Sequence, residues 1–314
     1  MKRTWQNRAA IDFVGTRDPT PMDCIDEFAT FFIDRYVRCP LCDSTRIVRS
    51  HAFDLDAARL IWDRCTDCSL VFQNPRLTNS AIAALYRSQD YFGREGFSHS
   101  AAYVDYLRYD RIRVEQSRRR MRRIIKVSGT RRGRLLDVGS ASGFFGVAAR
   151  EAGFDVTCIE PDIDLAAHGN KAHGLTFLVD TLENCSLDRE RYDVITVWGT
   201  ASVFLHPMRS FEQLVRALKP GGVLVMNPQD FDHWIRRVFP RLMIGWNVMF
   251  NLSNRSLDVL SRKLGLTLIH RGLEWQTVAV DHVFRVLRVR APAALRFGVM
   301  ALPAVSFPLI VARK

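Results

Sequence analysis

Apolar and polar positions along the middle of the chain follow the order expected of alternating strands and helices. Short apolar runs that fit buried strands occupy 134–139, 155–161, 175–180, 192–199 and 223–228. Between them, the 3.6-residue period of an amphipathic helix is found at 144–153, 163–174 and 209–222. Strands that alternate with helices favour right-handed crossovers and a parallel sheet. We therefore predict a doubly wound, Rossmann-like α/β fold.

The pattern is weaker on both sides of this core. Residues 1–37 have no clear period, and we interpret them as an N-terminal arm. Helices are expected at 78–92, 101–127 and 256–265, a strand at 266–275, and a packed helix with a final strand in the tail 295–314. The predicted divisions are 1–37, 38–76, a helical lead-in or lid at 77–130, the core at 131–232, and a C-terminal region at 233–314 that covers the substrate.

Composition adds two restrictions. The 314 residues are 47% hydrophobic with a net charge of +12, and the excess is local: 108–134 holds twelve Lys or Arg against two acids. The longest apolar run, 297–312, is too short for a membrane span and contains two prolines, and no signal peptide is visible. We expect a cytoplasmic protein, whose seven cysteines are metal ligands or buried thiols rather than disulfides.

Four of the cysteines form two Cys-x-x-Cys pairs, 39–42 and 65–68, separated by 22 residues. Each pair places two thiolates on one side of a tight turn, and two such turns supply the tetrahedral sulfur set that zinc prefers. A closed four-ligand site predicts a structural Zn²⁺ in a small ribbon. The predicted ligands are Cys39, Cys42, Cys65 and Cys68.

The stretch "LLDVGSASGFFG" joins the first core strand to its helix through glycines. As a dinucleotide turn it lacks the first glycine, because Ala141 occupies that place, and it leaves Asp137 inside the strand. The alternative register is Asp137-x-Gly139-x-x-x-Gly143, with the carboxylate at the carboxyl end of the strand, where open α/β sheets bind ligands. Glu160 ends the second strand, where an acid can accept both ribose hydroxyls of either cofactor.

The second register resembles the motif of class I S-adenosylmethionine (SAM)-dependent methyltransferases, in which Ala141 is usually glycine. The resemblance implies that Asp137 faces the methionine amino group, that Glu160 binds the ribose and that 180–182 holds the adenine. Trp198 would border the ligand, although packing at a strand end explains it equally well. The cofactor residues so implied are Asp137, Gly139, Ser140, Gly143, Glu160, Pro161, Asp180, Thr181, Leu182 and Trp198.

The cysteine pairs extend the likeness. Together with "LYRSQDYF", "YVDYLRYDRIR" and "LKPGG", they resemble a methyltransferase subgroup with an N-terminal zinc ribbon, found in bacterial sugar, polysaccharide and natural-product pathways. This resemblance implies methyl transfer to a small-molecule acceptor. The arginines of 108–134 could meet an anionic one, such as a nucleotide-sugar or glycolipid. One departure is that 199–203 lacks the Glu-His of related enzymes. Candidate bases are then His206, Asp230, His233 and His282.

Two alternatives stay open. The arginines of the basic helix 108–134 could form a phosphate-binding stripe and indicate an RNA methyltransferase, although a solvated helix is the simpler interpretation. The altered segment 199–203 could instead mark a SAM-fold protein whose degenerate acceptor site leaves it a binding partner. The apolar tail leaves peripheral membrane contact as a minor hypothesis.

Overall fold

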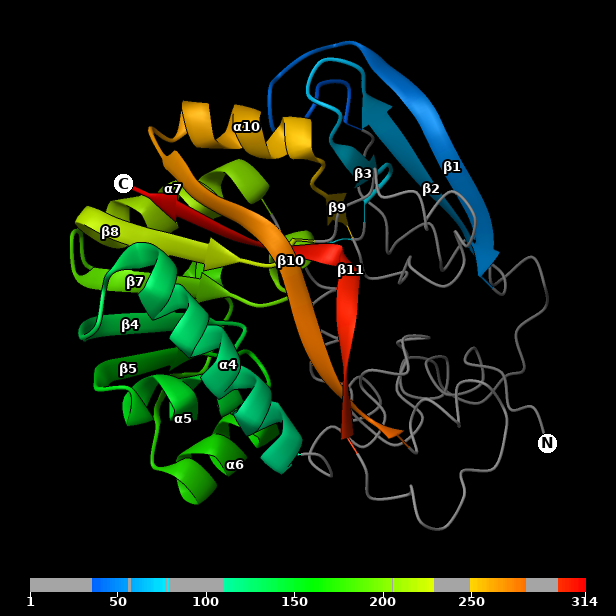
Figure 1. Cartoon of the computed structure of the whole chain (residues 1–314). Helices are drawn as coiled ribbons and strands as arrows, with labels where there is room; N and C mark the ends of the chain where they lie inside the picture. Colours follow the sequence, from blue (N-terminus) through cyan, green and yellow to red (C-terminus); the bar gives the residue numbers. More distant parts are fainter. Residues whose placement is uncertain are drawn as a thin grey trace, which may run out of the picture.

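The computed structural model describes residues 36–55, 58–76, 78, 110–204, 206–228, 249–280 and 299–314, which form two β-sheets (Figure 1). The larger sheet has seven strands in the order β6-β5-β4-β7-β8-β11-β10. The first five are parallel, whereas β11 and β10 run antiparallel. The strands are β4 (Gly133–Val138), β5 (Phe154–Ile159), β6 (Thr176–Leu178), β7 (Tyr192–Val197), β8 (Leu218–Met226), β10 (Thr267–Ala279) and β11 (Val299–Arg313).

Helices cover both faces of this sheet. On one face, α4 (Asp110–Ser128) and α5 (Phe144–Glu151) pack over the central strands with an apolar cluster of their own. On the other, α7 (Pro207–Ala217) and α10 (Asn254–Lys263) share a second cluster. A further helix of the described part, α6 (Ile163–His173), follows β5. The central strands are therefore buried on both faces, which explains why β4 and β7 carry consecutive buried apolar residues rather than an alternation.

Helix boundaries follow local signals. The Asp162 side chain accepts a hydrogen bond from the Leu165 N–H at 2.9 Å and begins α6, and Gly174 ends it in the left-handed conformation. Ser253 and Ser256 form a reciprocal capping box at the start of α10. These caps satisfy backbone groups that would otherwise lack partners.

The smaller sheet has the order β1-β2-β3-β9, all antiparallel. Its strands are β1 (Ile47–Leu55), β2 (Ala58–Cys65), β3 (Val71–Gln73) and β9 (Phe250–Asn251). The last comes from the C-terminal half of the chain and closes the edge of β3. Trp62, Phe72 and Phe250 are fully buried in the same cluster as α7 and α10. The cysteine-bearing segment and the large sheet therefore share one hydrophobic core.

Two expectations need correction. The helix expected at 209–222 ends at Ala217, and "KPGG" already belongs to strand β8. In the tail, Val299–Arg313 is one strand, so the expected helix is absent from that part. Only Ile310–Arg313 pair with β8, and 305–308 lie at a register shift against β10. Pro303 and Pro308 thus lie outside the β8 ladder, where a missing N–H costs little.

Some expected elements lie outside the described residues, namely the arm 1–35, the helix 78–92 except Thr78, and positions 101–109 of the lead-in helix. The rest of that helix is α4. Among the described residues, no helix combines the length and apolar character that a membrane crossing requires.

Candidate functional site

The glycine turn occupies five residues between β4 and α5. Gly139, Ala141 and Gly143 all have positive φ, of 68°, 48° and 82°. The Gly139 and Ser140 N–H groups donate to the Ile159 carbonyl, which holds the turn against β5. Gly143 caps α5 without any side-chain hydrogen bond, so the helix N–H groups face the turn. The turn has the left-handed geometry that the motif predicts, and Ala141 adopts it despite its Cβ.

Substituting Gly139 tests how tightly this turn is built. A Cβ there would lie 2.0 Å from Thr200 Oγ1 and 2.9 Å from Thr200 Cβ, so rotating the threonine cannot remove the clash. Gly139→Ala should cost about 1–2 kcal/mol of backbone strain plus about 1–3 kcal/mol of overpacking, measured by urea denaturation. Gly221→Ala is the matched control: its φ is 76° but nothing lies within 4 Å. Equal losses in both variants would contradict the close approach of the turn to Thr200.

Asp137 lies deeper than its place near the strand end suggests. It is the second-last residue of β4 and only 1% exposed, so it does not sit at an open cleft mouth as expected. Thr196 Oγ1 on the neighbouring strand donates to Asp137 Oδ1 at 2.6 Å, while Oδ2 has no partner. Burial raises the pKa of Asp137 to about 7, against the Thr196 hydrogen bond and the charge of Arg120. A buried carboxylate with one free oxygen is suited to bind a cation.

Glu160 follows β5 and is also buried. Its Oε2 accepts from the Ala141 N–H at 2.7 Å and its Oε1 from the Asp162 N–H at 3.0 Å. These bonds connect the carboxylate directly to the glycine turn. Burial raises the pKa of Glu160 to about 7, and the two backbone hydrogen bonds oppose the rise. Each oxygen keeps a second lone pair, so the group retains the capacity to accept hydroxyl donors.

The segment expected to hold an adenine forms a compact turn. Asp180 Oδ1 accepts hydrogen bonds from the N–H of the neighbouring Thr181 at 2.7 Å and from Asn184 Nδ2 at 2.9 Å. Leu182 is buried at the start of the 3₁₀ turn η2 (Leu182–Asn184). The Thr181 hydroxyl is buried without a partner. Both bonds use Oδ1 of the exposed Asp180, so its Oδ2, together with Thr181 and Leu182, stays available at this end.

Trp198 follows β7 and packs toward the helical face rather than standing alone at a strand end. Its ring centroid lies 5.0 Å from that of Phe145 and 4.3 Å from Arg120 Cζ. Arg120 also forms an ion pair with the buried Glu274 of β10. Sequence reasoning missed both of these residues. The only signal was the basic helix, which does not distinguish one arginine from the next.

The segment 199–203, where related enzymes carry an acid and a histidine, is held by its own hydroxyls. Thr200 Oγ1 donates to the Trp198 carbonyl and Ser202 Oγ to the Gly199 carbonyl, both at 3.2 Å. The Gly199 N–H donates to Asn227 Oδ1 at the end of β8. Strand β9 packs against the 3₁₀ turn η3 (Ala201–Val203). No group in this segment titrates near neutral pH, so a base must come from elsewhere.

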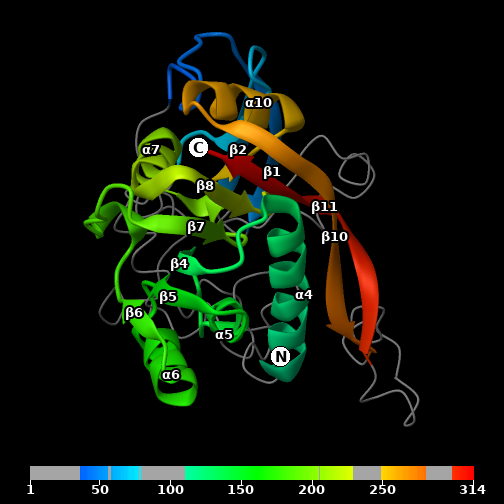
Figure 2. The same ribbon diagram turned by 60° about the vertical axis from the view of Figure 1, so that its left-hand side comes forward.

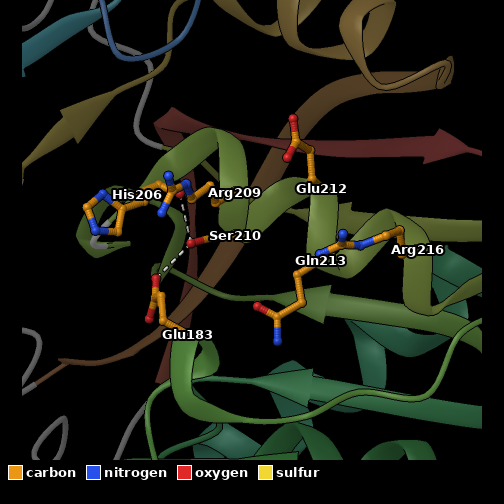
Figure 3. Close-up of a pocket in the computed structure, with 7 residues that line it drawn as sticks. All are labelled: Glu183, His206, Arg209, Ser210, Glu212, Gln213 and Arg216. Carbon is orange, nitrogen blue, oxygen red and sulfur yellow. Dashed lines mark hydrogen bonds between the residues drawn. The ribbon is translucent and has the colours of Figure 1, made fainter.

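His206 lies at the start of α7 and lines a pocket of about 410 Å³ (Figure 3). Burial lowers the pKa of His206, as do Arg76 and Arg209, while Glu183 raises it. The pocket lies between η2 and α7, on the face opposite α4 and α5, so its histidine is not grouped with the glycine turn. Its other lining residues are of mixed charge and range from the buried Ser210 to the exposed Arg209, Glu212 and Arg216. Asp230, His233 and His282 lie outside the described residues.

The four predicted cysteine ligands converge. All four Sγ atoms lie within 4.8 Å of one another, with Cys39–Cys68 and Cys42–Cys65 at 3.5 Å. This spacing is too long for a disulfide and close to the roughly 3.8 Å edge of a sulfur tetrahedron with metal–sulfur bonds of about 2.3 Å. A positive-φ residue, Asp43 or Ser69, follows each pair. The two turns therefore have matching local geometry, as a two-knuckle site requires.

The basic helix uses several of its arginines internally. Arg118 makes a bidentate pair with Glu151, both contacts at 2.7 Å. Arg123 donates to the Leu273 carbonyl and approaches His270 Nε2 at 3.0 Å. With Arg120 bound to Glu274, these side chains join α4 to α5 and β10. They are thus directed at the protein's own elements.

The chain was compared with protein families, curated proteins and solved structures. A methyltransferase domain family model matches residues 109–271, which is more than half of the chain. No curated protein sequence matches it significantly.

Solved structures with a similar fold include SAM-dependent methyltransferases from three organisms. The Thermotoga maritima protein is 20% identical, with a TM-score of 0.47 over 67% of this chain and 94% of its own. The Leishmania major protein is 13% identical, with a TM-score of 0.47 over 74% and 81%. The Mesorhizobium loti protein is 17% identical, with a TM-score of 0.42 over 61% and 96%. On the family match, the chain belongs to the methyltransferase domain family and is a SAM-dependent methyltransferase.

Proposed function

We propose that this methyltransferase transfers the SAM methyl group to a small, polar acceptor, a sugar or a polysaccharide or natural-product precursor. We further propose that the four-cysteine cluster holds a structural Zn²⁺. The observation that carries the placement of SAM is the buried, unpartnered Oδ2 of Asp137 beside the glycine turn. The placement of the acceptor rests on the junction between the small sheet and the segment 199–203.

The described residues fit SAM at the turn. Asp137 Oδ2 would take the methionine ammonium, and the N-terminus of α5 beyond Gly143 favours its carboxylate. The remaining lone pairs of Glu160 would accept the ribose hydroxyls, with Pro161 beside them. The unpartnered Thr181 hydroxyl and Leu182 would border the adenine. Gly139 and Ser140 complete the wall, and a side chain at Gly139 would push Thr200 away.

SAM supplies an electrophilic methyl group on a sulfonium, and the protein's contribution is to align the acceptor and exclude water. An acceptor hydroxyl would also have to lose its proton to a base. Because 199–203 carries no titratable side chain, that base lies outside this segment. His206, Asp230, His233 and His282 remain the candidates, and the position of His206 beside η2 makes it the weakest of the four.

Polar groups on strand β9 of the small sheet support the proposal that the acceptor is polar. The Met249 N–H donates to the Ser202 carbonyl at 2.9 Å, so β9 directly adjoins the segment that follows β7. Next to it, the Asn251 side chain is fully buried and neither its oxygen nor its nitrogen has a partner. A buried amide without partners is costly unless a ligand satisfies it. A hydroxyl-rich acceptor placed between the two sheets would supply both a donor and an acceptor.

The test is a methyl-transfer assay with radiolabelled SAM, the zinc-loaded full chain and two sets of acceptors. We expect label in nucleotide-sugars and none in total or ribosomal RNA. Label in RNA alone would contradict the proposal and favour the basic helix as an RNA-binding element. Tight SAM binding without transfer to any acceptor in a broad sugar and glycolipid panel would contradict it in favour of a binding protein. Asp137→Asn serves as the inactive control.

A further inference from the structure

Helix α4 has a buried face and an exposed face on opposite sides of its axis. In Figure 2 it lies along the outside of the large sheet, between α5 and the β10–β11 hairpin. Its buried face consists of Ser117, Met121, Ile124 and Ser128. The basic residues of its exposed face are Arg111, Arg119, Arg122 and Lys126. With about 3.6 residues to a turn, the centres of the two sets lie about 150° apart, so the exposed set forms a basic row about 22 Å long that points away from the protein.

The basic row continues beyond the end of α4. Arg131, Arg132 and Arg134 are exposed in the residues that follow the helix, so the positive charge extends to the start of β4. Of these three, only Arg134 has an ion pair within the described residues, with the exposed Asp155 at 3.8 Å. Water and salt screen an exposed pair of this length, so it neutralises little of the charge.

The basic row does not hold the fold together. Arg119 and Arg122 lie three residues apart, and Arg122 and Lys126 four apart, so like charges are neighbours on the helix surface and repel one another. Glu115 offsets part of this repulsion, at 3.5 Å from both Arg119 and Arg122. The inward arginines of the same helix, by contrast, bind groups of α5 and the hairpin. The outward charges therefore destabilise α4 unless an anionic surface neutralises them.

The composition of the basic row indicates which anionic surface it fits. Neither α4 nor 129–134 contains an aromatic residue on which a nucleic-acid base could stack, and a helix presents a convex surface rather than a groove. No large apolar side chain of α4 is exposed, so the row has nothing to insert into a bilayer. A straight row of basic side chains does fit a flat layer of anionic lipid headgroups, to which clusters of about four to eight Lys or Arg are attracted.

We propose that the basic row of α4, together with Arg131 and Arg132, docks the protein on a membrane surface that carries anionic lipid headgroups. The attraction is electrostatic, so it grows with the fraction of anionic lipid and weakens as salt screens it. It depends neither on the placement of SAM nor on the identity of the acceptor. A glycolipid acceptor would lie on the same surface, and docking would raise its concentration at the enzyme.

The experiment is co-sedimentation of the full chain with vesicles of two compositions. One is phosphatidylcholine alone and the other contains about 30% phosphatidylglycerol, each at about 0.05 M and 0.15 M salt. We expect binding to the anionic vesicles only, and weaker binding at the higher salt. The triple variant Arg119→Gln/Arg122→Gln/Lys126→Gln should bind about 100-fold more weakly, because each basic residue near the surface contributes about fivefold.

The matched control is Arg255→Gln/Arg262→Gln/Lys263→Gln, which removes three exposed charges from α10 on the other side of the sheet and should bind like the wild type. An equal loss in both triple variants would mean that net charge alone drives binding, and the proposal would be wrong. A wild type that ignores anionic vesicles at low salt, or that binds neutral vesicles equally well, contradicts it too. Arg119→Lys/Arg122→Lys keeps the charge and the helix, so it should keep the affinity.

Nucleic acid is the competing anionic partner, and filter binding of single-stranded and double-stranded RNA at the same salt tests it. We expect weaker binding to either RNA than to the anionic vesicles. If the wild type binds RNA more tightly, and the α4 triple variant loses that binding, the basic row is a nucleic-acid surface and the proposal is wrong. Neither SAM nor an acceptor enters these assays, so an error in the proposed function does not change their result.

Discussion

Removal of zinc by a chelator is expected to unfold the small sheet and to release one metal ion per chain. Zinc contributes about 10–16 kcal/mol of apparent binding free energy to small cysteine sites. Cys39, Cys65 and Cys68 are buried together with Leu41 and Leu70, so the cluster is the centre of this part of the core. Losing even about 3 kcal/mol should lower the Tm by roughly 4–5 °C for a chain of this length.

The effect should extend to the catalytic side of the molecule. Unfolding β3 would remove the partner of β9, and β9 adjoins the segment after β7 through the Met249–Ser202 hydrogen bond. We therefore expect lower methyl transfer as well as a lower Tm. Metal content by mass spectrometry and thermal unfolding by circular dichroism measure the two effects.

Single substitutions separate the cluster from the other thiols. Cys65→Ser should lose the metal and the stability, whereas Cys158→Ser, a buried cysteine on β5 outside the cluster, should keep the metal. The assignment of the four-cysteine zinc site would be refuted if Cys65→Ser kept its full zinc content, or if the wild type contained no zinc.

Asp137→Asn is expected to weaken SAM binding by about 30-fold or more, because it removes the charge that pairs with the ammonium. Titration calorimetry with S-adenosylhomocysteine measures the loss. Asp155→Asn on the neighbouring strand β5 is the matched control. That carboxylate is exposed, and its one described ion pair, with Arg134 Nε at 3.8 Å, is long and solvated. Unchanged affinity in Asp137→Asn would remove Asp137 from the cofactor site.

The same variant should not be less stable near pH 8. Burial raises the pKa of Asp137 to about 7, above its unfolded value, so its contribution to stability is full below about pH 4 and is lost as the pH rises through 7. Asparagine has no such loss and can still accept the Thr196 hydrogen bond. We expect an equal or higher Tm for Asp137→Asn at pH 8, as for other sites where function opposes stability.

The pH dependence of affinity should follow the same group. The ammonium pairs with the ionised carboxylate, so wild-type affinity should rise with pH up to about 7, by at most about tenfold per unit for each carboxyl that must ionise. In Asp137→Asn the dependence should become shallower but persist, because burial also raises the pKa of Glu160 to about 7. An identical pH profile in both proteins would mean that Asp137 does not titrate in this range.

Local sequence patterns determined much of this protein. The apolar period marked the five parallel strands, the left-handed turn from Gly139 to Gly143 came from its glycines, and the two Cys-x-x-Cys pairs indicated a four-sulfur cluster by their spacing alone. These features depend on residues close in the chain, whose spacing limits the backbone geometry they can adopt. For the same reason, the residues that cap α6 are recognisable in the sequence.

Only the tertiary structure decided the rest. Arg120, Trp198 and Glu274 meet although the helix, β7 and β10 that carry them are far apart in sequence, and no pattern distinguishes Arg120 from the arginines beside it. The two-residue strand β9 closes the small sheet from the other half of the chain. Asp137 is buried rather than open, although it is the second-last residue of its strand. Such contacts depend on how whole elements pack, which spacing along the chain does not encode.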